Sequence, residues 1–196
     1  KIRFGTDNAL LVVVTNSGRD DVLPASTDMN LYGGIYREAE LILTERTAIS
    51  PLYLGSDGVL VHPQTVSPEK VEGEIEVHIT SKGDNNCSLN IEITNPEGEQ
   101  VFSKRQKARL DGKPVTVPFA VDNPRLWNPH DPALYTVTAS IGEDSITDSV
   151  VVRTGFRTIG ASTAEGLTIN GERIPVHGVA LYHDNALSGG TLVPED

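Results

Sequence analysis

The sequence of 196 residues predicts an all-β protein built around an antiparallel two-sheet sandwich. Apolar residues alternate with polar residues in several short stretches, which is the period of a half-buried strand. Turn-forming residues separate these stretches, and the chain contains 18 Gly and 12 Pro. Short alternating strands with frequent turns are typical of a sandwich domain of about 100 residues.

Two strand-like segments precede the predicted sandwich. Residues 9–15 form a continuous apolar, β-branched run, which is typical of a strand covered on both faces. Residues 34–43 resume with strand-like composition after a long polar loop. Because an isolated pair of strands is marginally stable in water, we do not expect residues 1–48 to form a domain by themselves.

The sandwich itself is predicted after Pro51, where alternation becomes regular. Four rows of inward-facing residues are expected, followed by a last strand at residues 146–152. The rows are Ile75, Val77 and Ile79; Leu89, Ile91 and Ile93; Val115, Val117, Phe119 and Val121; and Tyr135, Val137, Ala139 and Ile141. The competing helical window, residues 100–110, lacks a sustained apolar stripe.

The alternation fades after Arg153. Residues 167–176 predict a hairpin that turns on Asn170-Gly171, since Asn-Gly favours the tight turn that joins two antiparallel strands. Residues 177–196 have no strand or helix pattern of their own. They are expected to pack against parts of a protein that this chain does not include.

The composition excludes some classes of function. A net charge of -11, with 16 basic residues scattered among 27 acidic ones, argues against a nucleic-acid partner and is compatible with a neutral partner such as a sugar. No apolar run approaches the roughly 20 residues that cross a bilayer, so no membrane partner is expected. The single cysteine, Cys87, rules out an internal disulfide. The sequence leaves the compartment open between bacterial periplasm, secretion and cytoplasm.

Two irregular segments contain candidate binding residues. The loop of residues 26–34 places Asp28 beside an amide, an aromatic residue and two glycines, a mixture suited to hydroxyl recognition or a bound cation. A loop whose Asp28 only caps its own backbone is equally compatible. His183 and Asp184 follow Tyr182 in the irregular tail, where binding residues tend to sit.

Trp127, the sole tryptophan, lies in a proline-rich stretch. A tryptophan among prolines can stack on a sugar ring, but one that leads into a strand more often closes the end of a sandwich. We favour the structural role for this residue. None of the five histidines has a partner at metal-site spacing, and no phosphate loop or nucleophile elbow occurs.

Three stretches, in this order, resemble glycoside hydrolase family 2, the family of β-galactosidases, β-glucuronidases and β-mannosidases. They are residues 28–37, residues 124–127 with 132–137, and residues 155–157 with 169–179. The resemblance implies three domains. Residues 1–48 would be the C-terminal strands of a sugar-binding jelly roll, 49–155 an immunoglobulin-like β-sandwich, and 156–196 the start of a catalytic (β/α)8 barrel.

The resemblance also implies site residues. Asp28 matches the family's jelly-roll aspartate, which contacts the hydroxyls of the sugar or a monovalent cation near them. Tyr182 stands where the family usually has a sugar-binding histidine, and His183 beside it is a second candidate for contacting the sugar. Both catalytic glutamates of the family would lie beyond Asp196, so no catalytic residue is assigned. This segment would need no cofactor, whereas a Na⁺ or Mg²⁺ ion is compatible with the full-length enzyme.

The first hypothesis is therefore a segment of a retaining β-glycosidase of β-galactosidase type, acting on β-linked carbohydrates with a terminal galactoside and inactive when isolated. A homo-oligomer of the full-length enzyme is compatible with this hypothesis. The alternative from another class is a non-catalytic carbohydrate-binding or adhesion β-sandwich module. A third reading is a structural spacer, in which replacing Asp28 with alanine would leave the activity of the intact protein unchanged.

Overall fold

The computed structural model describes residues 2–17, 33–35, 38–181 and 189. The chain divides into two units, one formed by Leu43–Val176 and the other by Lys1–Ile42 together with His177–Asp196. The strands β1 to β12 all belong to the Leu43–Val176 unit. The described residues include no helix that is long and apolar enough to cross a membrane.

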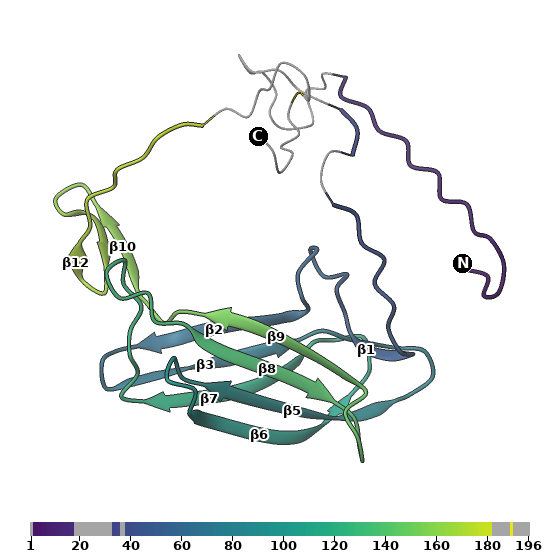
Figure 1. The fold of residues 1–196 in the computed structure, drawn as a ribbon. Coiled ribbons are helices and arrows are strands. Elements are labelled where there is room, and N and C mark those ends of the chain that lie inside the picture. The colour runs from purple at the N-terminus through teal and green to yellow at the C-terminus, as the bar shows by residue number, and fades with distance from the viewer. Residues whose placement is uncertain (1, 18–32, 36–37, 182–188, 190–196) are drawn as a thin grey trace. The chain divides into compact units, whose positions relative to one another are not determined.

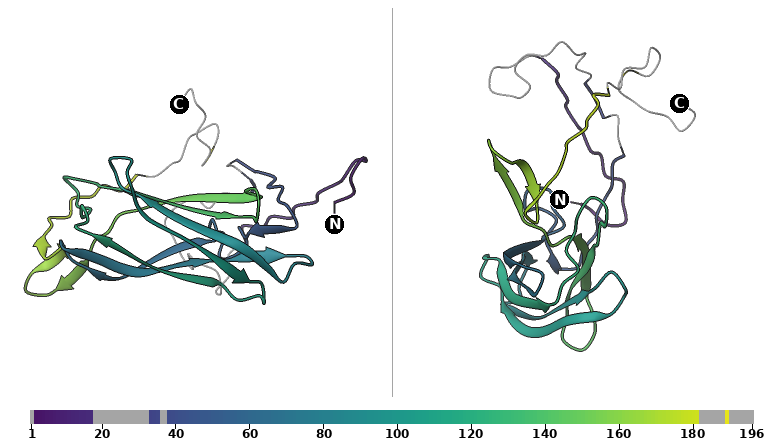
Figure 2. Two further views of the ribbon diagram at one scale, coloured as in Figure 1. Left: turned by 90° about the horizontal axis from the view of Figure 1, so that it is seen from below. Right: turned by 90° about the vertical axis from the view of Figure 1, so that its left-hand side faces the viewer.

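The Leu43–Val176 unit is an all-β sandwich, as predicted (Figure 1). One antiparallel sheet has four strands in the order β6-β5-β8-β9, and the other has three in the order β2-β3-β7. The bounds of the four-stranded sheet are β5 (Asn86–Thr94), β6 (Gln100–Arg109), β8 (Tyr135–Ile141) and β9 (Asp148–Thr154). Those of the three-stranded sheet are β2 (Val59–Val66), β3 (Lys70–Val77) and β7 (Val115–Asp122). Figure 2 shows the two sheets as facing layers.

Two small sheets complete the unit. β1 (Thr47–Ile49) pairs with β4 (Ile79–Ser81), and so spans the domain boundary expected at residue 48. β10 (Ile159–Ser162), β11 (Gly166–Ile169) and β12 (Glu172–Arg173) form the second small sheet. The predicted Asn-Gly hairpin is confirmed between β11 and β12, where Asn170 and Gly171 have φ angles of 52° and 80°. Positive φ at both central residues is what this turn requires.

The core lies between the two main sheets and follows the predicted alternation. Every predicted inward residue is buried except Ile79 and Val115, which are partly buried and pack against the core. Ile79 differs because β3 ends at Val77 and the chain starts the short strand β4 after a one-residue break. Full burial of each large apolar side chain stabilises the fold by about 1.5–3 kcal/mol, so this alternation accounts for the sandwich.

Two sandwich strands were not expected from the alternation. The window of residues 100–110 forms the edge strand β6, whose inward row mixes the apolar Phe102 and Ala108 with the half-buried polar residues Lys104 and Gln106. β2 is also an edge strand and contains Pro63 at a shift in register. Edge strands and bulges are where a proline is tolerated within a sheet.

The two strands expected before the sandwich do not form among the described residues. Residues 9–15 are extended but unpaired, with Leu10, Leu11 and Val13 between 85% and 89% exposed. Within residues 34–43, the described positions are likewise outside any strand. A strand forms only when a neighbouring backbone accepts its hydrogen bonds, and none of the described residues does so here. The jelly-roll, sandwich and barrel division of the chain stays a prediction.

Candidate functional site

The predicted sugar-binding residues Asp28 and His183, and the neighbouring Tyr182, lie outside the described residues. Their roles stay predictions. The described residues nevertheless bring together the other two stretches on which the family resemblance rests. This junction lies where the loop of residues 123–134 meets the segment of residues 155–158 and the β11–β12 turn.

Trp127 lies at the centre of the junction. Its backbone N–H donates to the carbonyl oxygen of Phe156 at 2.9 Å. A Cβ added to Gly155 would lie 2.8 Å from the Trp127 side chain, so the tryptophan packs directly on the glycine backbone. The Arg157 guanidinium lies 4.7 Å from the centre of the tryptophan ring, a cation–π contact. Trp127 is half-buried by these contacts, in keeping with a structural role at the end of the sandwich.

Asn170 joins the hairpin to this tryptophan. Its side-chain Nδ2 donates to the carbonyl oxygen of Trp127 at 3.0 Å. Its Oδ1 accepts a hydrogen bond from the backbone N–H of Thr158 at 2.9 Å, and its own N–H donates to the Thr158 carbonyl at 3.0 Å. One amide side chain therefore ties the β11–β12 turn both to the segment before β10 and to the loop before β8.

The junction is anchored in the core by Phe156, which is fully buried. Its ring lies 4.6 Å from that of Tyr135 and 5.9 Å from that of Phe119, measured between ring centres. Such aromatic pairs contribute about 0.5–1.5 kcal/mol beyond the area they bury. Because Phe156 stands between Gly155 and Arg157, the residues that contact Trp127 are held in place by the core.

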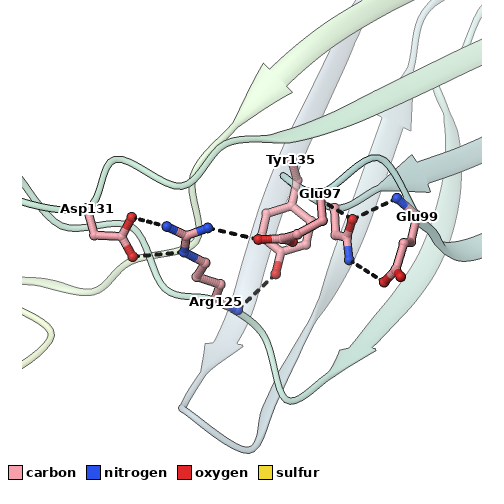
Figure 3. A network of polar contacts seen from close by, with 6 residues as sticks. Glu97, Glu99, Arg125, Asp131 and Tyr135 are labelled. Atoms are coloured by element: carbon pink, nitrogen blue, oxygen red, sulfur yellow. Dashed lines mark hydrogen bonds and ion pairs between the residues drawn. The ribbon is translucent and has the colours of Figure 1, made fainter.

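A polar network lies beside the junction and is drawn in Figure 3. The Arg125 guanidinium contacts both carboxylate oxygens of Asp131, with Nε 2.8 Å from Oδ2, and donates through Nη1 to Glu97 at 2.8 Å. Its backbone N–H donates to the hydroxyl of Tyr135 at 2.9 Å. The hydrogen bond and charge of Arg125 lower the pKa of Asp131, and the two carboxylates raise the pKa of Arg125.

The network continues into the turn between β5 and β6. Asn95 Oδ1 accepts hydrogen bonds from the backbone N–H groups of Glu97 and Glu99, and its Nδ2 donates to the Glu99 carboxylate (Figure 3). The ion pair of Glu97 with Arg125 could not be predicted from local sequence, because the two residues are 28 positions apart. These contacts fix loops and leave no carboxylate pair arranged for catalysis within the network.

The histidines have mixed positions. His62 and His130 are exposed. His78 is not a surface residue, because its side chain is only 15% exposed, stacks on Tyr53 at 3.8 Å and lies 2.6 Å from the Glu76 carboxylate. The chain leaves β3 at this position, which turns the ring toward the loop before β2. In the described part of the chain, no group of three His, Cys, Asp or Glu residues is placed to hold a metal ion.

A solvent-open hollow of about 740 Å³ lies among the residues before β1 and the turns before β5 and β9. Its charged lining residues are Glu45, Arg46, Asp84, Glu143 and Asp144. Cys87 also lines it, and burial raises the pKa of the thiol. A thiol with a raised pKa is a poor nucleophile, so the hollow offers an acidic surface without an activated side chain.

Comparison with known proteins matches residues 58–157 to Glycosyl hydrolases family 2. Over 201 residues the chain is 33% identical to a β-glucuronidase of Bacteroides fragilis, an alignment that covers 99% of this chain and 29% of that protein. It is 28% identical to a β-galactosidase of Thermoanaerobacter pseudethanolicus, covering 97% of this chain and 25% of that enzyme.

A solved structure with a similar fold is Bacteroides uniformis β-glucuronidase 2, covalently bound to cyclophellitol-6-carboxylate aziridine. Its TM-score is 0.77 at 26% sequence identity, with 93% of this chain and 23% of that chain covered. The chain thus spans between 23% and 29% of the length of these three relatives.

Proposed function

The chain belongs to glycosyl hydrolases family 2, and on this premise we propose that it is a non-catalytic segment of a retaining β-glycosidase that hydrolyses β-linked carbohydrates. The observation that carries the proposal is the alignment of 99% of the chain with less than a third of a β-glucuronidase. A segment of that size leaves most of such an enzyme to other parts of a longer polypeptide.

The described side chains support a structural role for the segment. Retaining glycosidases place two carboxyl groups about 5 Å apart on either side of the scissile bond. The described carboxylates Glu97 and Asp131 both pair with Arg125, which neutralises them. The family resemblance puts the general acid and the nucleophile on later strands of the barrel.

For the sugar itself, we retain the terminal β-galactoside as the proposed substrate, supported by the β-galactosidase of T. pseudethanolicus among the relatives. A β-glucuronide is the second candidate, because the 33% identical relative is a β-glucuronidase. Asp28 is proposed to contact the sugar hydroxyls or a monovalent cation near them. His183 is proposed as a second residue that contacts the sugar. A Na⁺ or Mg²⁺ ion and a homo-oligomeric full-length enzyme stay predictions.

The test uses the full-length protein that contains this chain, assayed with nitrophenyl β-galactoside and nitrophenyl β-glucuronide. We expect turnover of the galactoside to exceed that of the glucuronide. The reverse order would contradict the galactoside as substrate and support the glucuronide. Binding of either sugar without turnover would instead support the carbohydrate-binding module and contradict the glycosidase.

The role of Asp28 is tested in the same protein. Asp28→Ala should reduce kcat/KM by an amount equivalent to about 1–3 kcal/mol of transition-state binding, because a hydrogen bond to the substrate is lost. Asp144→Ala is the matched control, since Asp144 is an exposed acidic residue of the sandwich. Equal activity of the two variants would contradict the sugar contact of Asp28 and support the hypothesis that the segment is a structural spacer.

A further inference from the structure

The turn of the β11–β12 hairpin makes side-chain contacts that the hairpin itself does not need. An Asn-Gly turn requires only that both residues adopt positive φ, which Asn170 and Gly171 do. Glycine would meet that requirement at residue 170 as well as asparagine. Both polar atoms of the Asn170 side-chain amide, however, form hydrogen bonds with groups outside the hairpin. The partners are the Trp127 carbonyl and the Thr158 N–H.

We infer that Asn170 is a positioning residue, which locks the three-stranded β10–β12 sheet onto the end of the sandwich. The hydrogen bond from Asn170 to Trp127 joins residues 43 positions apart, so it connects two elements and not two ends of one turn. Trp127 in turn is hydrogen-bonded to the core residue Phe156 and packs on Gly155. The contacts of Asn170 therefore connect the β10–β12 sheet to the core.

The rest of the hairpin explains why such a lock is needed. β11 and β12 are short strands; Leu167, Thr168 and Ile169 of β11 are half-buried, and both residues of β12 are exposed. Ile159 of β10 is 64% exposed. A small sheet with this little buried apolar surface is marginal without outside contacts. The hydrogen bonds of the Asn170 side-chain amide therefore supply contacts from outside the sheet that such a small sheet needs.

Three variants of the 196-residue chain test the lock. Asn170→Asp keeps an oxygen for the Thr158 N–H but removes the donor to Trp127, and Asn170→Gly keeps the positive φ and removes the side chain without adding charge. Glu172→Gln is the matched control, because Glu172 is an exposed residue of the same hairpin with no described contact to the tryptophan.

The first readout is the fluorescence of Trp127, which reports on the junction alone because the chain has no other tryptophan. Both Asn170 variants should move its emission to longer wavelength and make it more accessible to acrylamide, whereas Glu172→Gln should match the unaltered chain. A change in Asn170→Asp that is absent in Asn170→Gly would reflect the added charge and overturn the inference.

The second readout is amide hydrogen exchange. Amides of β10 and β11 should exchange at least about fivefold faster in the Asn170 variants, the change expected when a hydrogen bond that closes a local structure is lost. Amides of β5 and β8 should keep their rates. Unchanged exchange in β10 and β11, or equal acceleration in β5 and β8, would contradict a local lock.

The bearing of the lock on catalysis rests on the proposed function. In the full-length protein, Asn170→Asp should lower kcat/KM and Glu172→Gln should not, because the β10–β12 sheet lies in the segment proposed to begin the catalytic barrel. Equal activities would contradict this bearing on catalysis. A full-length protein with no glycosidase activity would contradict the proposed function, while fluorescence and exchange would still decide whether the lock exists.

Discussion

At Gly155 the lack of a side chain lets Trp127 lie directly against the backbone. Neither φ nor a turn demands glycine there, since Gly155 is not among the residues with positive φ. Glycine is required at this position because there is no room for a side chain. An added Cβ would lie 2.8 Å from three atoms of the tryptophan side chain. A methyl group at this position has to displace either the ring or the core residue Phe156 next to it.

Gly155→Ala should therefore destabilise the fold by about 1–3 kcal/mol, the usual cost of inserting an extra carbon into a packed site. Urea-induced unfolding measures this change in the free energy of unfolding. Gly178→Ala serves as the control, because a Cβ there meets no atom within 4 Å. Equal stability of the two variants would show that Trp127 is not held against the backbone.

The ion pair of Asp131 with Arg125 predicts a pH effect. Arg125 lowers the pKa of Asp131 in the folded state, through a hydrogen bond and its charge. The pair thus stabilises the fold above the unfolded-state pKa of aspartate, about 3.9, and this contribution is lost as the pH falls through the lower folded-state pKa. In strong acid Asp131 is protonated in both the folded and the unfolded protein, so its charge no longer contributes to stability.

Asp131→Asn should accordingly be less stable than the unaltered protein near about pH 6, and the difference should shrink toward zero below about pH 3. Urea unfolding of both proteins across this range checks the prediction. The exposure of the pair keeps the effect small, as for most surface ion pairs. A stability difference that is the same at every pH would show that the charge of Asp131 contributes nothing.

At the scale of the element, the alternation and the turns predicted the hairpin and five sandwich strands, including β9 at the position of the last predicted strand. They did not predict β2 and β6. β5 and β8 are central strands whose apolar rows face the core, so their sequences alternate clearly. β6 and β2 lie at sheet edges, where polar residues and Pro63 are tolerated and the alternation is lost. Residues 9–15 are strongly apolar, and the composition predicted a strand. They form none, because no described segment pairs with them and an unpaired run forms no sheet.

Strands in the core and strands outside it should respond differently to the loss of side-chain volume. Ile91 of β5 is fully buried between the sheets, and Ile159 of β10 is 64% exposed. Ile91→Ala should cost about 2–5 kcal/mol in the free energy of unfolding, through lost burial and the cavity left behind. Ile159→Ala should stay within about 0.5 kcal/mol of the unaltered protein. Similar urea midpoints for both variants would contradict the assignment of β5 to the core.

At the scale of the whole molecule, the sequence identified the family from three separated motifs but did not show that two of them meet. Trp127 and Asn170 are 43 positions apart, and no local period reports a contact over that distance. The same limit applies to Arg125 with Glu97, a pair 28 positions apart. Asp28 and His183 were chosen by resemblance to family motifs, and they lie outside the described residues.

The central proposal is that this chain is a folded, structural segment of a β-glycosidase that lacks the catalytic carboxylates. The most direct test is the hydrolysis of nitrophenyl β-galactoside and nitrophenyl β-glucuronide by the purified 196-residue chain, with the full-length protein assayed beside it. We expect cooperative unfolding of the chain, no turnover of either substrate by the chain alone, and turnover of the preferred substrate by the full-length protein. Measurable turnover by the chain alone would contradict the proposal.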